Sequence, residues 1–277
     1  MTEVYFVKTR HHYDSYTDFF RLAELSGFPI IYTDELDTSK DGVYITAPLN
    51  GEWEPHIDNQ RDKPRRAYLI QWNIERPSGS AGTGGEYMRR QWWLMHNRYF
   101  DEVWVSDATL AQESALRFVV LGSDEGLGEP GDEKKFNFCH MSYETGRRQT
   151  IYSSFPSSSI APNCWPPERD NVLKQSRFAL NVHQDRHPYQ EPLRLALFAA
   201  YGLPIISESI YNMYPWIEET IITVGYDSLV SRLRQALTED YAPYQEMGLR
   251  ARERMCKEFQ FGAVVRQAVK ESVEQWR

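Results

Sequence analysis

The fold is decided by the stretch Phe178-Ala-Leu-Asn-Val-His-Gln-Asp-Arg-His-Pro-Tyr-Gln-Glu-Pro-Leu-Arg-Leu-Ala-Leu-Phe-Ala-Ala-Tyr-Gly-Leu-Pro-Ile-Ile-Ser-Glu208. Its pattern predicts a strand, a charged loop, a helix and a second strand. A loop in this place lies at the carboxyl end of a parallel strand, where open α/β sheets bind their ligands. The predicted helix starts at Glu191-Pro192-Leu193, so the unbonded N–H groups of its first turn face that loop. We therefore expect this helix to hold an anion.

Short apolar strands alternate with helices along the rest of the chain, which predicts parallel sheets covered by helices. Strands are expected at residues 4–7, 29–32, 43–46, 67–72, 102–106, 136–141, 178–182, 204–207 and 221–224. Helices are expected at residues 16–25, 87–99, 109–116, 147–155, 169–175, 192–201, 228–237, 243–259 and 263–276. Gly27 and Gly202 should each end a helix, and Asp227 should cap the helix that follows it.

These elements predict an α/β protein of two doubly wound, Rossmann-like domains that face a central cleft. The first domain would span residues 1–122 and the second residues 136–277, with the last helix either completing the second domain or returning to the first. Residues 123–135 are rich in glycine, proline and charge, so a linker is expected there.

Composition limits the classes of protein that this chain can represent. With 277 residues, 41% of them hydrophobic and 25% charged, the chain can bury a sizeable core. A net charge of −8 argues against a surface that blankets nucleic acid, although a local basic cleft stays compatible with it. The three cysteines form no Cys-x-x-Cys pair, and no apolar run approaches the roughly 20 residues that span a bilayer. A cytoplasmic protein without membrane insertion is therefore expected.

Three segments of the second half carry a likeness to a known family. They are residues 141–150 with the pair Arg147-Arg148, residues 166–183 ending in Leu-Asn-Val-His, and Glu191–Arg194 together with residues 201–208. In this order they resemble the nucleotide-sugar-binding domain of GT-B-fold glycosyltransferases, particularly the group-1-like branch that includes CgeB-like proteins. Residues 71–76 and 101–107 echo the same branch in the first half. The resemblance implies that the second domain binds a nucleoside diphosphate sugar, a UDP-sugar first of all, and that the first domain binds the acceptor.

One departure from the family pattern limits what the resemblance implies. Retaining members carry Glu-x7-Glu, and the place of the second glutamate is Leu197 here, or Ala199 when counted from Glu191. Retention or inversion of the sugar's configuration is therefore not predicted.

The donor-binding candidates are residues whose chemistry suits a diphosphate and a ribose. Arg147, Arg148 and Arg194 can stabilise the charge that grows on a departing diphosphate, together with the helix start at Pro192 and Leu193. Glu191 would accept hydrogen bonds from ribose hydroxyls, and His183 would contact phosphate or sugar. The structural alternative is that Glu191 complements a helix dipole, the arginines form a solvated face and His183 only ends a strand.

Candidates for the catalytic base lie in the first half. His11, His12 and Asp14 follow the first predicted strand, and Glu75 follows a later strand together with Asn73. His11, His12, Asp14 and Glu75 can each take a proton from an acceptor hydroxyl, and Asn73 and Glu75 can instead bind the acceptor. For the first loop the alternative is that Asp14 or Ser15 caps the next helix and the histidines are solvated.

A glycine-rich segment and a basic aromatic helix separate these candidates from the next strand. Residues 77–85 are expected to form a mobile lid, because they lack the spacing of a phosphate-binding loop. Arg89, Arg90, Trp92 and Trp93 would either stack on a nucleic-acid strand or belong to the core.

The sequence therefore predicts a glycosyltransferase that moves a sugar to the hydroxyl of a glycan precursor, a protein or a hydroxymethylated pyrimidine in viral DNA. No cofactor is expected, and the lack of any Asp-x-Asp favours a metal-independent reaction. A non-catalytic binder of nucleotides or sugar phosphates, and a sugar-nucleotide epimerase of similar architecture, are the alternatives.

Overall fold

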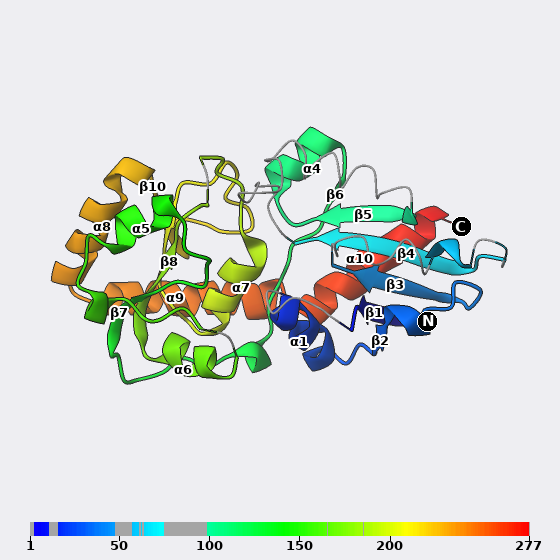
Figure 1. Ribbon diagram of the computed structural model, residues 1–277, viewed down its shortest axis with the longest axis horizontal. Helices are drawn as coiled ribbons and strands as arrows, with labels where there is room; N and C mark the ends of the chain where they lie inside the picture. Colours follow the sequence, from blue (N-terminus) through cyan, green and yellow to red (C-terminus); the bar gives the residue numbers. More distant parts are fainter. Residues whose placement is uncertain are drawn as a thin grey trace. The chain divides into compact units, whose positions relative to one another are not determined.

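The computed structural model describes residues 3–10, 16–47, 57–60, 62, 64–74, 99–164, 166–184 and 186–276. The chain divides into two compact units (Figure 1). Unit 1 consists of Met1–Leu121 with Phe261–Arg277, and unit 2 of Gly122–Gln260. Residues 123–135, where a linker is expected, thus fall within unit 2, and the last helix falls within unit 1.

Unit 1 is built on a parallel sheet with the strand order β2-β1-β3-β4-β5-β6. The strands are β1 (Val4–Lys8), β2 (Ile30–Tyr32), β3 (Gly42–Thr46), β4 (Ala67–Asn73), β5 (Glu102–Val105) and β6 (Arg117–Phe118). The helices described in this unit are α1 (Thr17–Leu25), η2 (Thr33–Glu35), α4 (Ala108–Ser114) and α10 (Phe261–Trp276).

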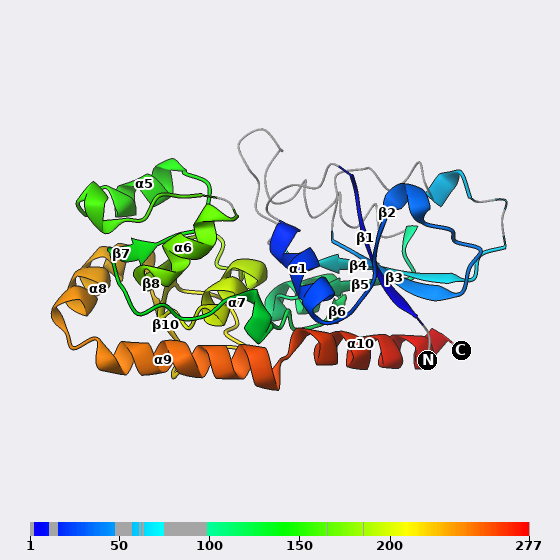
Figure 2. The same ribbon diagram turned by 90° about the horizontal axis from the view of Figure 1, so that it is seen from below.

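Aromatic side chains pack α1 and α10 onto one face of this sheet. Figure 2 shows the ribbons of both helices next to the strands. Phe6 of β1 and Trp72 of β4 both pack against Phe19 of α1 and Phe261 of α10, with ring centroids 5.3 to 5.8 Å apart. Strands β3 and β4 are buried along their whole length, as inner strands of a parallel sheet are, and β4 buries the polar Gln71 and Asn73 as well as its apolar residues. Helix α1 ends before Gly27, whose φ of +77° is the left-handed conformation that glycine adopts at low cost.

Unit 2 contains a second parallel sheet, with the order β10-β9-β8-β7. Its strands are β7 (Phe136–Cys139), β8 (Ser176–Asn181), β9 (Ile205–Glu208) and β10 (Ile221–Val224). The helices are η4 (Glu125–Leu127), α5 (Gly146–Tyr152), η5 (Ser157–Ser159), α6 (Glu168–Lys174), α7 (Pro192–Ala200), α8 (Tyr226–Thr238), α9 (Ala242–Glu253) and the π-helical η6 (Arg254–Glu258). The expected parallel sheets and the strand–loop–helix–strand order of residues 178–208 are thus confirmed.

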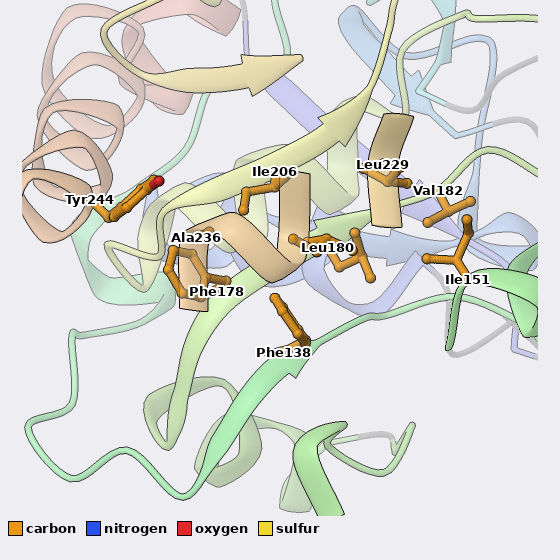
Figure 3. Close-up of a cluster of buried hydrophobic side chains, with 10 residues drawn as sticks. Phe138, Ile151, Phe178, Leu180, Val182, Ile206, Leu229, Ala236 and Tyr244 are labelled. Atoms are coloured by element: carbon orange, nitrogen blue, oxygen red, sulfur yellow. The ribbon is translucent and has the colours of Figure 1, made fainter. Parts of the chain in front are cut away.

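A buried cluster on this second sheet fixes α8 against the strands (Figure 3). Phe178 and Leu180 of β8 and Ile206 of β9 lie in it with Leu229 and Ala236 of α8. The helical side chains lie seven residues apart and so occupy one face of α8, which buries that face and leaves the opposite one to solvent.

Two local predictions differ from the structure. Asp227 does not cap α8, because the helix begins earlier, at Tyr226, with Gly225 in extended conformation at the N-cap. The helix expected at residues 243–259 is also not uniform, since α9 changes into the π-helical turn η6 after Glu253. The helix expected at residues 87–99 lies mostly outside the described residues.

Helix α9 passes very close to the turn between α7 and β9. A Cβ atom at Gly248 would lie 2.2 Å from the carbonyl oxygen of Gly202 and 2.7 Å from the nitrogen of Pro204. Both are backbone atoms, so neither can rotate away.

We expect Gly248→Ala to lower the free energy of unfolding by about 1–3 kcal/mol, because the backbone of α9 must shift to make room. Urea denaturation measures this change. Gly146→Ala is the control, since a Cβ there meets nothing within 4 Å and alanine favours the helix. Equal stability of Gly248→Ala and the unchanged protein would contradict the close approach.

Candidate functional site

The carboxyl edge of the unit 2 sheet gathers polar side chains from several elements. His140 follows β7, His183 lies two residues beyond β8, Glu208 ends β9, and Glu191 precedes the first residue of α7. All four side chains are buried. Because the strands are parallel, these residues share the edge at which α/β sheets bind ligands.

The Glu191 carboxylate lies at the centre of this group. Its Oε2 is 2.5 Å from Nη1 of Arg194, and its Oε1 accepts a hydrogen bond of 3.2 Å from Nη2 of Arg148. Burial alone would raise the pKa of Glu191, but the guanidinium of Arg194, followed by His183 and Arg148, outweighs burial and holds this pKa well below its usual range. Glu191 is therefore a carboxylate in the folded protein at neutral pH.

Arg148 is held on three sides. Besides its bond to Glu191, Nε donates to the carbonyl of Val182 at 2.8 Å and Nη1 to the carbonyl of Tyr143 at 2.8 Å. Only 2% of its side chain is exposed. Arg148 thus ties α5 to the loops that follow β7 and β8, and its surroundings make it a buried positioning group.

Arg147, the neighbouring residue, pairs with the second buried carboxylate. Two of its guanidinium nitrogens donate to Glu208, Nη1 at 2.9 Å to Oε2, and the guanidinium stacks 3.6 Å from the ring centre of Tyr226. Oε2 of Glu208 also accepts a 3.1 Å bond from the backbone N–H of His183. Glu208 therefore joins Arg147 to the end of β8.

Arg194 is the third guanidinium of the group. Its Nε donates to the carbonyl of Met141 at 2.7 Å and its Nη1 to Oδ1 of Asn181 at 2.9 Å. The side chains of Arg147 and Arg194 are 18% and 17% exposed, so both reach solvent, unlike Arg148.

The charge balance and the unused hydrogen-bond donors at this edge are suited to an anion. The three guanidinium groups meet two carboxylates here, which leaves one excess positive charge within the group. No described residue accepts a hydrogen bond from Nη2 of Arg194 or Nε of Arg147. The backbone N–H groups of the first turn of α7 lie beside them, because Glu191 is the N-cap residue and Pro192 the first helical residue.

His183 has a defined hydrogen-bonding pattern. Its ring Nε2 lies 2.9 Å from the carbonyl oxygen of Ser209, so Nε2 carries the proton. Its Nδ1 faces Oε2 of Glu191 at 3.8 Å. The ring thus bridges β8 and the segment that follows β9.

A second histidine at this edge was not foreseen. The His140 ring stacks on Tyr152 at 4.1 Å, and its Nδ1 lies 3.2 Å from Oγ of Ser142, which in turn lies 3.2 Å from the Tyr152 hydroxyl. Burial, aided by the charges of Arg194 and Arg148, lowers the pKa of His140 to about 4. The ring is therefore neutral at physiological pH and adds no charge to the site.

The structure brings all donor-binding candidates together at one edge of unit 2. These are Arg147, Arg148, His183, Glu191, Pro192, Leu193 and Arg194. The sequence analysis did not select Glu208, Tyr226 or His140. Glu208 and His140 could have been found, because each is a polar residue at the end of an apolar strand.

The candidates for the catalytic base are His11, His12, Asp14 and Glu75, and they lie outside the described residues. The same holds for residues 77–85 and for Arg89, Arg90, Trp92 and Trp93. In the part of the chain that is described, no three His, Cys, Asp or Glu side chains group as a metal site would need. No described helix is both long and apolar enough to cross a membrane.

Comparison with known proteins gives matches in structure only. No family model and no curated protein matches the chain, so the likeness to CgeB-like proteins stays a prediction. Anabaena Alr3699/HepE, solved with UDP and glucose, has a TM-score of 0.64 at 9% identity, over 98% of this chain and all (100%) of that one. TarM has a TM-score of 0.60 at 8% identity over 91% of this chain, which spans only 57% of TarM.

A third match is an alpha-glucosyltransferase solved with UDP and a 13-mer DNA. Its TM-score is 0.58 at 10% identity, over 95% of this chain and 98% of that one. At such identities the likeness is one of fold. The fold of this chain is thus an α/β fold that it shares with glycosyltransferases.

We expect Glu191→Gln to lower the free energy of unfolding by about 3 kcal/mol at pH 7, because it leaves Arg148 buried without its carboxylate. Since the pKa of Glu191 is depressed in the fold, its contribution is complete above the unfolded pKa, near 4.5, and is lost as pH falls through the lower folded value. The difference between the two proteins should therefore narrow below about pH 4.5.

Urea denaturation at pH 7 and at several lower values measures this difference. Glu246→Gln serves as the control, because Glu246 is an exposed carboxylate in a surface pair with Arg250 and should change stability by less than about 0.5 kcal/mol. A difference between Glu191→Gln and the unchanged protein that stays constant from pH 7 to pH 3 would refute the assignment.

Proposed function

We propose that this protein is a glycosyltransferase that moves a sugar from a UDP-sugar to an acceptor hydroxyl, and that unit 2 binds the donor. One observation carries the proposal: three guanidinium groups face two buried carboxylates at the carboxyl edge of the unit 2 sheet, beside the first turn of α7. The excess positive charge suits a diphosphate. Support comes from the fold, which is shared with HepE, solved with UDP and glucose, and with an alpha-glucosyltransferase solved with UDP.

The proposed chemistry assigns different tasks to the three arginines. When the bond between sugar and diphosphate breaks, negative charge grows on the departing UDP, and fixed positive groups lower the free energy of that state. Arg147 and Arg194 reach solvent and would donate to the diphosphate oxygens, helped by the backbone N–H groups of Leu193 and Arg194. Arg148 would hold Glu191 in place, and Glu191 would accept hydrogen bonds from the ribose hydroxyls.

Transfer also requires a general base that removes the proton of the acceptor hydroxyl. We propose that this base comes from His11, His12, Asp14 or Glu75, which follow strands of unit 1 in the sequence. Since guanidinium groups and helix N–H groups supply the positive charge at the diphosphate, we propose a reaction that proceeds without a metal ion.

Titration calorimetry with UDP tests the donor site. We expect Arg147→Gln and Arg194→Gln each to weaken UDP binding about 10- to 100-fold, because each removes a charged hydrogen bond to the diphosphate. Arg250→Gln is the matched control; Arg250 is an exposed arginine on α9 and its loss should leave UDP affinity unchanged. Unaltered UDP affinity in both site variants would reject the donor assignment.

Turnover separates catalysis from binding alone. We expect Asp14→Asn or His12→Ala to lower kcat by about 100-fold or more while UDP affinity stays the same, because a general base acts on the acceptor proton and not on the donor. Release of free sugar from UDP-glucose, followed by nuclear magnetic resonance, gives kcat in the absence of a known acceptor. Full activity in both variants would show that neither Asp14 nor His12 acts as the base. UDP binding with no turnover in the unchanged protein would favour a nucleotide-binding protein over an enzyme.

A further inference from the structure

Exposed aromatic side chains lie on the loops that follow β7 and β9 of unit 2. Of the described residues, the large apolar side chains that stay exposed include Tyr143 after β7, and Tyr211, Tyr214 and Ile217 after β9. Tyr211 is 56% and Tyr214 47% exposed. Tyr143 and Tyr211 therefore lie on loops that leave the sheet at the same edge as Glu208, and the backbone of Tyr214 is bonded to Gln190, the neighbour of Glu191. Ile217 lies closer to the opposite edge, where β10 begins.

The segment between β9 and β10, residues 209–220, is unusual for a parallel sheet and is called the tyrosine loop here. A connection between neighbouring parallel strands usually contains a helix, but this one contains none. Connections of this length without secondary structure are uncommon in compact domains and often serve binding.

Hydrogen bonds to buried groups hold the backbone of the tyrosine loop. Nε2 of the buried Gln190 donates to the carbonyls of Asn212 and Tyr214 at 2.6 and 2.8 Å, and the N–H of Tyr211 donates to the carbonyl of Pro188 at 2.7 Å. Near the far end of the loop, Arg254 donates to the carbonyl of Pro215 at 2.6 Å. The loop is thus anchored independently of any ligand.

The rings of the exposed Tyr211 and Tyr214 each pack against another aromatic ring of unit 2. Tyr211 packs edge to face on the buried Tyr189 at 5.4 Å, and Tyr214 packs in the same manner on Phe259 at 5.9 Å. Rings held in this way lose little conformational freedom when a ligand packs on them.

The charge of the tyrosine loop argues against nucleic acid. Residues 209–220 contain Glu218 and Glu219 but no lysine or arginine. Arg254, which contacts the loop, is paired with Glu258 at 2.7 Å, and Arg186 on the preceding loop offsets only one of the two glutamates. Phosphate chains require clustered positive charge, which this surface does not offer.

We propose that the tyrosine loop binds a neutral oligosaccharide, so that the acceptor of the proposed transfer is a glycan; this inference rests on the proposed function. The C–H faces of pyranose rings would pack on the electron-rich faces of Tyr211 and Tyr214. The exposed side chains of Asn212, Glu218 and Glu219 would exchange hydrogen bonds with sugar hydroxyls. A surface of this kind would contact several sugar units of one oligosaccharide, while the arginines and Glu191 would stay available to bind the UDP-sugar.

Saturation-transfer nuclear magnetic resonance on the full chain tests the inference. The probes are maltohexaose, cellohexaose and chitohexaose, each compared with a 13-nucleotide DNA duplex that carries 5-hydroxymethylcytosine. We expect at least one hexasaccharide to receive magnetisation on its ring protons, and its Kd to rise 10-fold or more in a Tyr211→Ala, Tyr214→Ala double variant. Leu249→Ala is the control, because Leu249 is 45% exposed on α9 and should leave saccharide binding unchanged.

UDP titration of the same samples keeps the two proposals apart. UDP affinity that is retained in the double variant shows that the variant is folded and that the donor site is intact. Saccharide binding lost together with retained UDP binding supports the inference, whatever the turnover assay shows. The inference would be overturned if the DNA duplex bound in a manner that depends on both tyrosines, or if none of the three hexasaccharides bound to the unchanged protein. If only UDP failed to bind, the donor assignment alone would be overturned.

Discussion

Burial of the Glu191 carboxylate is the constraint on which the site in unit 2 depends. A carboxylate removed from water costs several kcal/mol unless cations and hydrogen bonds compensate for it. Arg194 and Arg148 provide this compensation, and Arg148 in turn requires the carbonyls of Tyr143 and Val182. The contacts that neutralise one charge therefore also fix the loops after β7 and β8, so this edge is assembled without a ligand.

Most of the fold could be predicted because its signals are local. The apolar strands at residues 178–182 and 204–207 and the helix between them follow from periodicity, with Pro192 and Gly202 marking the helix ends. The start of α8 could not be predicted from Asp227, because Gly225 before it adopts the extended N-cap conformation that an aspartate normally takes. Strand β6 has only two residues, too few to give a pattern.

The candidate site could be predicted as a set of residues but not as a network. Arg147, Arg148 and Glu191 stand next to predicted strands and helices, which local sequence reveals. The pairing of Arg147 with Glu208, 61 residues away, depends on how β7, β8 and β9 align in the sheet, and no local pattern encodes that alignment. The exposure of Tyr211 and the burial of Trp216 within one loop are equally properties of the folded chain.

The helix-free connection between β9 and β10 can change in sequence independently of Glu191 and the arginines around it. Its ends are set by sheet pairing and its middle by hydrogen bonds from the side chain of Gln190 to main-chain carbonyls, so its outward side chains contribute little to the core. Substitutions there can accumulate without disturbing Glu191 or the arginines around it. If the tyrosine loop binds the acceptor as we propose, substitution of a few of its surface residues would change the acceptor and leave the proposed donor site unaltered.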